Sequence, residues 1–327
     1  MAEATIEERA RYSRERLEDL RNRLAGCEAM GEIPDLTVFT AGSYGRDEAG
    51  SHSDIDLFFL VQDRDKVKRA RTNELLLFAD LIRETRKMAI PEFSGDCRWL
   101  EIHSVKDILE KLGSASEDDL NYFTLRMLML LEGKWVAGEG AYQAARKEFI
   151  AAYYRDYPDH SLSFEPTFLL NDIGRYWKTL LLNYENLRNQ REKSEADRMK
   201  SKVRNFKLKF SRMTTCFATI AALGSHETPV RAEDVEQIVD LIPLARLNLV
   251  AENRPQTRSH VDALRGEYSW FLEQTADGNE ALQARFTDKQ VRIEMFRRAN
   301  EYRTKMFDLL RTLDADSNIG LLRTLVI

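Results

Sequence analysis

Hydrophobic and polar residues alternate in different ways along the first hundred residues, and each pattern predicts an element. Residues 5–30 place Leu17, Leu20 and Leu24 at helical spacing along one narrow stripe, so we expect a long, charged helix there. The glycine and proline that follow this segment predict the end of the helix.

Three short segments have the composition of strands. They read DLTVFTAGS, DIDLFFLVQ and CRWLEIHSV, and they occupy residues 35–43, 54–62 and 97–105. Between the last two, residues 69–88 have helical periodicity. After the first helix we therefore expect the order strand, strand, helix, strand.

Past residue 105 the periodic segments favour helices, and no further strand is expected. The predicted fold class is α+β, with a small mixed β-sheet core and its helices followed by an all-helical domain. We expect the N-terminal helix and the sheet core in residues 1–110. A helical domain in residues 111–327 would close a ligand cleft.

The composition describes an ordinary folded protein. Of the 327 residues, 43% are hydrophobic and 31% are charged, which excludes an intrinsically disordered chain. The net charge of −5 gives no overall attraction to nucleic acid. Any basic site has to be local, and we expect no specific DNA binding.

The cellular location is predicted from the N-terminus, the apolar runs and the cysteines. The first twenty residues are charged throughout, unlike a signal peptide, and no run approaches the ~18 apolar residues of a membrane span. Cys27, Cys97 and Cys216 are scattered and odd in number, which favours reduced thiols. We expect a cytoplasmic protein with no membrane partner.

The second expected strand begins with two carboxylates. Asp54 and Asp56 project from one face of a strand, where their mutual repulsion is costly unless cations neutralise it. Oxygen ligands held in this way suit Mg²⁺ or Mn²⁺ carrying a polyphosphate. The alternative is a surface pair at the mouth of a strand. That alternative does not explain why the next residues, LFFLV, are all apolar.

A two-metal site generally needs one more acidic ligand. Glu101 lies in the third expected strand between Leu100 and Ile102, and it is our candidate ligand for the metal that activates the attacking hydroxyl. Asp96, just before that strand, is the second choice. The candidate metal ligands and catalytic residues are therefore Asp54, Asp56 and Glu101.

Gly42 and Ser43 close the first expected strand. The glycine lets the backbone approach a ligand, the amides after it can point at an anion, and the serine hydroxyl is a short-range donor. This combination suits the terminal phosphates of a nucleotide. The alternative is a tight turn between a strand and a helix. The P-loop pattern GxxxxGK[ST] is not present here.

Together these residues resemble the signature of the DNA polymerase β-like nucleotidyltransferase superfamily, in which G-S is followed by D-x-D. The stretch GSYGRDEAGSHSDIDLFFL resembles the N-terminal catalytic region of bacterial PII uridylyltransferases. WLEIHSVKDILE, LRMLMLLEGKWVAGEGAYQAARKEF and FLLNDIGRYWKTL resemble later segments of that family, so the similarity spans residues 35–180. Full-length members of that family also carry phosphohydrolase and ligand-sensing domains, and we do not expect these domains in the 327 residues of this sequence.

The resemblance implies roles for particular residues. Gly42 and Ser43 would contact the nucleotide phosphates, and Asp54 and Asp56 would hold the metals. Superfamily members also grip the triphosphate with residues of the helical domain, usually a lysine and a serine or tyrosine.

In this chain the implied counterparts are Lys207 or Lys209 together with Ser211. They lie in residues 188–212, where ten basic residues face three acidic ones. The alternative for each is a solvated basic helix. Asp172 and Arg175 share a helical face further upstream and form either an internal ion pair or a contact to base or ribose.

The expected activity is transfer of a nucleoside monophosphate from a nucleoside triphosphate to the hydroxyl of a protein or small-molecule acceptor, with release of pyrophosphate. One alternative is a synthase that makes a cyclic or linear oligonucleotide messenger. Another is a non-catalytic nucleotide-binding regulatory module. The residues specify neither the base nor the oligomeric state.

Overall fold

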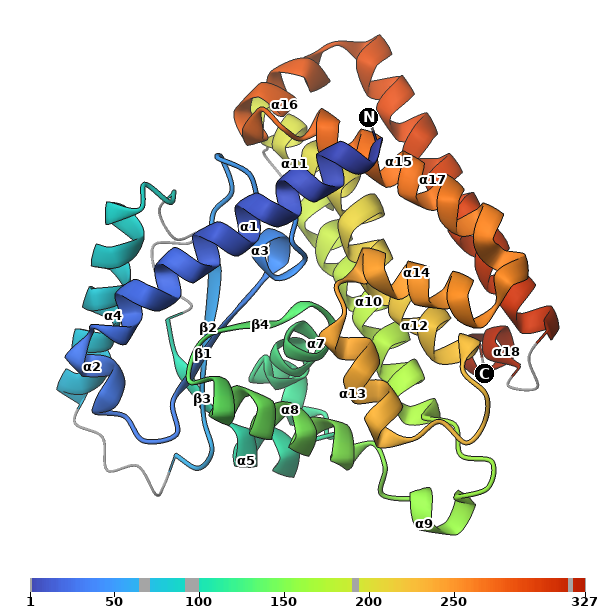
Figure 1. Cartoon of the computed structure of the whole chain (residues 1–327). Helices are drawn as coiled ribbons and strands as arrows, with labels where there is room; N and C mark the ends of the chain where they lie inside the picture. The colour runs from blue at the N-terminus through green and yellow to red at the C-terminus, as the bar shows by residue number, and fades with distance from the viewer. Residues whose placement is uncertain (1, 65–70, 92–99, 190–193, 317–319, 327) are drawn as a thin grey trace. The chain divides into compact units, whose positions relative to one another are not determined.

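The computed structural model describes residues 2–64, 71–91, 100–189, 194–316 and 320–326 (Figure 1). The chain folds into two compact units, one formed by Glu7–Ala152 and the other by Met1–Ile6 with Tyr153–Ile327. We call them the sheet unit and the helical unit. The α+β class, with a small mixed sheet followed by a mostly helical region, is confirmed. The domain boundary expected near residue 110 stays a prediction.

The sheet unit contains, among the described residues, one four-stranded sheet of order β3-β2-β1-β4. β2 and β4 each run antiparallel to β1, whereas β3 is parallel to β2, so the sheet is mixed. The strands are β1 (Thr37–Ala41), β2 (Asp56–Val61), β3 (Ile102–Ser104) and β4 (Lys134–Ala137).

Helices surround this sheet, and apart from the first residues of α1 they belong to the sheet unit. Their bounds are α1 (Ala2–Ala25), α2 (Glu28–Gly31), α3 (Gly42–Gly45), α4 (Arg71–Lys87), α5 (Val105–Glu110), α6 (Ser116–Asp119), α7 (Tyr122–Glu132) and α8 (Glu139–Ala152). The expected segments 5–30 and 69–88 correspond to α1 and α4.

One face of the sheet forms a core with α1 and α4. The leucine stripe of α1, Leu17, Leu20 and Leu24, is at most 1% exposed and packs in one cluster with Leu57 and Phe59 of β2. Burying an aliphatic side chain of this size contributes about 2 kcal/mol, so the narrow stripe is enough to hold a charged helix on the sheet.

The other face of the sheet packs against α8. Phe58 of β2 lies opposite Phe39 of β1, and the two rings stack with their centroids 5.2 Å apart. Phe39 in turn meets Tyr142 of α8 at 6.0 Å. Because both faces of β2 are covered, its sequence is continuously apolar after the acidic start.

The strand β4 corrects the expectation that only helices follow residue 105. Three of its four residues pair with β1: Lys134 lies opposite Thr40, Trp135 opposite Phe39 and Ala137 opposite Val38, with a shift of register between Val38 and Phe39. A Cβ on Gly138, whose φ is +69°, would lie 2.0 Å from the carbonyl oxygen of Leu36. Residues 134–137 therefore form a strand because they pair with β1, which lies almost a hundred residues earlier in the sequence. The helical periodicity of the segments on either side does not indicate this pairing.

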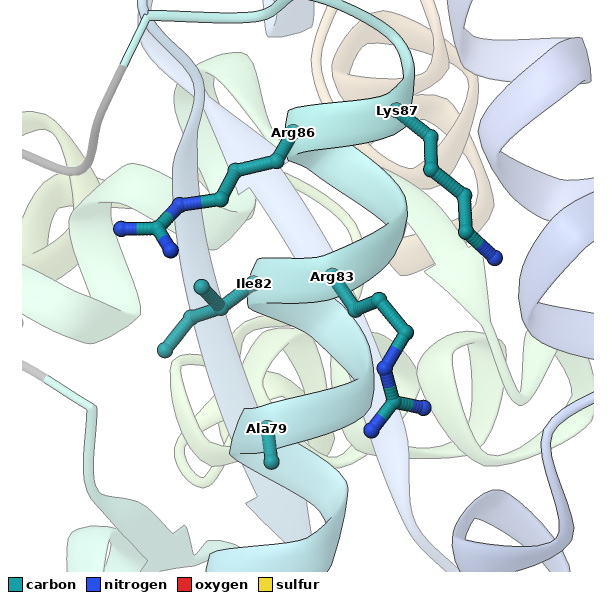
Figure 2. A pocket seen from close by; sticks show the side chains of 5 residues that line it. All are labelled: Ala79, Ile82, Arg83, Arg86 and Lys87. Carbon is teal, nitrogen blue, oxygen red and sulfur yellow. The ribbon is translucent and has the colours of Figure 1, made fainter.

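The outer side of α4 carries a shallow hollow (Figure 2). Ala79, Ile82, Arg83, Arg86 and Lys87 line it, all from this one helix. Two of the cations have acidic partners one turn earlier: Arg83 donates to Asp80 and Lys87 to Glu84, each at 2.6 Å. The hollow is thus a surface feature of a solvated helix face.

The helical unit is built from the following elements: α9 (Tyr157–His160), α10 (Thr167–Asn189), α11 (Glu195–Lys207), the π-helical turn η1 (Leu208–Arg212), α12 (Met213–Ser225), α13 (Ala232–Asp240), α14 (Pro243–Asn253), the 3₁₀ turn η2 (Pro255–Thr257), α15 (Arg258–Gln274), α16 (Gly278–Thr287), α17 (Lys289–Asp316) and α18 (Leu321–Val326). In the described part of the chain, none of the helices has the length and apolar character needed to span a bilayer.

The central helix of this unit is α12. Its sequence MTTCFATIAALGS is apolar on nearly all sides, and it packs against α10, α14 and α17. Next to it, Phe210 of η1 stacks on Phe271 of α15 at 4.8 Å and on Tyr302 of α17 at 4.6 Å. The segment FKLKFSR therefore contributes its aromatic residues to the core.

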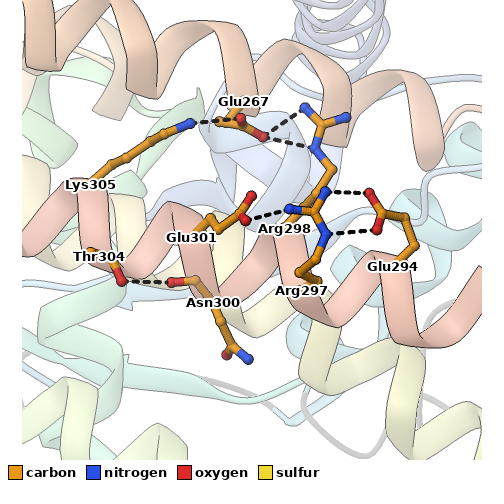
Figure 3. A network of polar contacts seen from close by, with 8 residues as sticks. All are labelled: Glu267, Glu294, Arg297, Arg298, Asn300, Glu301, Thr304 and Lys305. Atoms are coloured by element: carbon orange, nitrogen blue, oxygen red, sulfur yellow. Dashed lines mark hydrogen bonds and ion pairs between the residues drawn. The ribbon is translucent and has the colours of Figure 1, made fainter.

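A network of ion pairs joins α15 to α17 (Figure 3). Glu267 accepts hydrogen bonds from Arg298 and from Lys305, both at 2.7 Å, and only 14% of its side chain is exposed. The Arg298 guanidinium also lies 3.8 Å above the ring of Trp270. Burial raises the pKa of Glu267, but the hydrogen bonds from Lys305 and Arg298, together with the positive charges of these residues, outweigh it and leave that pKa below its usual value.

We expect Glu267→Gln to destabilise the protein at neutral pH by about 1 kcal/mol, because two cations lose their counter-charge. The pKa of Glu267 is lower in the folded than in the unfolded chain, so its contribution is complete above the unfolded pKa and is lost as pH falls through the folded one. Urea unfolding of both proteins from pH 7 to pH 3 measures this. A gap in unfolding free energy that stays constant down to pH 3 would contradict it.

Candidate active site

The two aspartates stand where β2 begins. Ile55 and Leu57 belong to the core cluster, whereas Asp54 is exposed and Asp56 is half-buried. The alternation turns both carboxylates away from that core, on the side of the strand that carries Phe58. Two acidic groups at the partly exposed edge of a buried strand are oxygen donors of the kind that Mg²⁺ and Mn²⁺ prefer.

Gly42 and Ser43 form a turn after β1, which we call the G-S turn, and this turn lies directly beside Asp56. Ala41, the last residue of β1, pairs with Asp56, and Gly42 follows with a φ of +70°. A Cβ placed on Gly42 would lie 2.9 Å from Oδ2 of Asp56. The glycine is therefore required twice, for its left-handed backbone and for the close approach of a carboxylate. Ser43 is half-buried in the same turn.

Behind the turn lies a buried ionic network that sequence analysis missed. The Gly42 amide donates to Oε1 of Glu132 at 3.3 Å, and Arg46 donates to Oε2 of the same residue at 2.6 Å. Arg46 also donates to Glu48 at 2.9 Å. The sequence signal for Glu132 is related to that of the aspartates: an acidic residue directly adjoins an apolar run, here at the end of LMLL.

The residues after the turn are held by α1 and β4. The Ala49 amide donates to Oγ of Ser13 in α1 at 2.9 Å, and Lys134 of β4 lies 2.5 Å from a carboxylate oxygen of Asp47. Tyr44 is buried, and burial together with the neighbouring Tyr12 raises its pKa to about 12, although Arg16 opposes the shift. Burial also lowers the pKa of Lys134. The segment is thus packed in place.

The candidate third metal ligand is Glu101. It lies just outside β3, its side chain is 61% exposed, and it is 4.0 Å from Arg64. Because β3 is parallel to β2 and Ile102 pairs with Phe59, the backbone of Glu101 lies next to that of Phe58. Within the described ranges no three Asp, Glu, His or Cys side chains gather closely enough to hold a metal ion. Asp96 is outside the described residues, so the third ligand stays a prediction.

The three residues assigned to the triphosphate belong to the helical unit. Lys207 donates to Asn279 at 2.6 Å and Lys209 donates to Asn300 at 2.8 Å. Burial and then the charge of Arg303 lower the pKa of Lys209. Ser211 is buried in η1, and π-helical turns are frequent at functional sites. The triphosphate contact of these residues stays a prediction.

Asp172 and Arg175 form an internal pair. Their charged groups are 3.7 Å apart, and the Tyr153 hydroxyl donates to Asp172 at 2.7 Å. Asp172 is only 4% exposed. Its neighbours in the helical unit thus account for the aspartate without a nucleotide.

Comparison with known families adds one match. Residues 25–114 match the sequence model of a family described as a nucleotidyltransferase domain. This match supports the polymerase β-like superfamily. The matched region contains β1, the G-S turn, both aspartates and β3, and its family acts on nucleoside triphosphates in general. No curated protein matches the chain.

Proposed function

We propose that the sheet unit transfers a nucleoside monophosphate from a nucleoside triphosphate to an acceptor hydroxyl and releases pyrophosphate. The observation that supports this best is the contact between the G-S turn and Asp56. It brings an anion-binding type of turn and a metal-binding type of carboxylate together within the region of the family match. We infer a relationship to PII uridylyltransferases from the GSYGRDEAGSHSDIDLFFL motif.

In this proposal Asp54 and Asp56 hold Mg²⁺ or Mn²⁺, which when bound would neutralise the triphosphate and lower the pKa of the acceptor hydroxyl. The donor set fits a hard divalent ion, since both groups are carboxylates and Asp56 is seated against Gly42. Glu101 would supply a further carboxylate. Ser43 would donate its hydroxyl to a phosphate oxygen.

The lysines of the helical unit would neutralise charge on the departing pyrophosphate. Lys207 donates to Asn279 and Lys209 donates to Asn300, and each of these asparagine side chains is a neutral partner. Both lysines would bring positive charge to the triphosphate. Ser211 would act with them. The acceptor is a protein side chain or a small molecule.

The test incubates purified protein with each of the four labelled triphosphates and Mg²⁺ or Mn²⁺, with and without an added cell extract. We expect pyrophosphate release, with mass spectrometry locating the label on an acceptor from the extract. An oligonucleotide product formed without extract would instead identify a messenger synthase. If folded protein released no pyrophosphate under any condition, the proposal would fail.

A further inference from the structure

The G-S turn rests on a buried pair of opposite charges. Glu132 ends α7 with a fully buried side chain, and Arg46, 7% exposed, follows α3. Removing both ions from water costs several kcal/mol each, which the attraction between them does not reliably recover. A buried ion pair of this kind is therefore weak evidence of stabilisation. We look for its role in the residues that it contacts.

Several of those contacts involve Gly42. The Gly42 amide donates to Oε1 of Glu132, while Oε2 accepts from Arg46. The Arg46 backbone amide donates to the carbonyl oxygen of Gly42 at 3.0 Å. The side chain of Glu132 thus holds the N–H of Gly42, while the Arg46 that pairs with Glu132 is tied to Gly42 by the backbone of α3.

The backbone around the pair leaves little room for adjustment. A Cβ on Gly45 would lie 1.9 Å from the carbonyl oxygen of Glu132, so the end of α7 packs directly against α3. On its other side Gly42 meets Oδ2 of Asp56. A shift of Glu132 would consequently move the glycine that seats the candidate metal ligand.

We propose that Glu132 and Arg46 are positioning residues of the nucleotidyl-transfer site. They hold Gly42 in its left-handed conformation and thereby fix the carboxylate of Asp56 relative to the G-S turn. The inference rests on the proposed function and assigns the pair no contact with the nucleotide. A displacement of about 1 Å of a reacting group is enough to reduce turnover strongly.

Glu132→Gln is the sharpest test. Gly42 and Arg46 each donate to a different oxygen of Glu132, and a glutamine has only one oxygen to offer them. The charged Arg46 takes that oxygen, and the Gly42 amide loses its acceptor. We expect kcat to fall by about tenfold or more, while the Kd for an α,β-methylene triphosphate changes by less than about threefold.

Glu117→Gln is the matched control. Glu117 pairs with Arg126 at 2.9 Å in the same unit, both side chains are fully buried, and neither contributes to the hydrogen bonds of Gly42. Like Glu132→Gln, the substitution Glu117→Gln removes one negative charge from a buried pair of glutamate and arginine. We expect a comparable fall in Tm, a kcat within about twofold of the wild type, and unchanged hydrogen exchange at the Gly42 amide.

Hydrogen exchange of the Gly42 amide provides a readout independent of turnover. We expect it to accelerate by about tenfold or more in Glu132→Gln alone. Equal kcat, per correctly folded molecule, in the two variants would overturn the inference, as would unchanged exchange at Gly42 in Glu132→Gln. Absence of pyrophosphate release from the wild type would instead count against the proposed function.

Discussion

Asp56→Asn is expected to reduce pyrophosphate release by about a thousandfold or more, which corresponds to about 4 kcal/mol of transition-state stabilisation. The substitution keeps the shape of the side chain that lies against Gly42 and removes only its charge. Because Asp56 is half-buried, the free energy of unfolding should change by no more than about 1 kcal/mol. Initial rates at saturating triphosphate measure the effect.

Asp63→Asn serves as the control for this prediction. Asp63 follows the other end of β2 and lies 3.4 Å from Lys106, away from the G-S turn. Pyrophosphate release by Asp63→Asn should stay within about twofold of the wild type. If Asp56→Asn retained a tenth of wild-type activity with both metals tested, Asp56 would not be a metal ligand of the reaction.

Gly42→Ala is expected to reduce activity by about a hundredfold and to lower the free energy of unfolding by about 1–3 kcal/mol. A φ of +70° is strained for alanine, and the new Cβ would stand 2.9 Å from Oδ2 of Asp56. Either the turn or the carboxylate has to move. Denaturant unfolding and pyrophosphate release, measured on the same preparation, separate the two effects.

Gly140→Ala is the matched substitution. It lies in α8 of the same unit, and a Cβ there meets nothing within 4 Å. Alanine inside a helix should be neutral or stabilising by up to about 1 kcal/mol, with activity unchanged. Full activity in Gly42→Ala would show that the close approach of Asp56 has no part in catalysis.

The elements that the sequence predicts correctly are those whose signal is local. The leucine stripe of α1 and the apolar run of β2 each encode their own burial, and the structure buries both. The sequence does not reveal β4, because four residues between two glycines become a strand only through pairing with β1.

The candidate site also combines contacts that the local sequence indicates with contacts that only long-range packing creates. The contact between Gly42 and Asp56 links residues fourteen positions apart, at the adjacent ends of the antiparallel strands β1 and β2. Glu132 comes from ninety residues further along, and only the packing of α7 against α3 brings it to the turn. Glu101 was expected inside a strand that begins one residue later, at Ile102.

The most direct test of the central claim is a titration with Mn²⁺ in the presence of an α,β-methylene triphosphate, followed by electron paramagnetic resonance. If Asp54 and Asp56 bind a divalent ion against the nucleotide, the variant Asp54→Asn/Asp56→Asn should bind Mn²⁺ about a hundredfold more weakly than the wild type. Equal Mn²⁺ affinity in the two proteins, or no nucleotide-dependent binding in the wild type, would contradict the account.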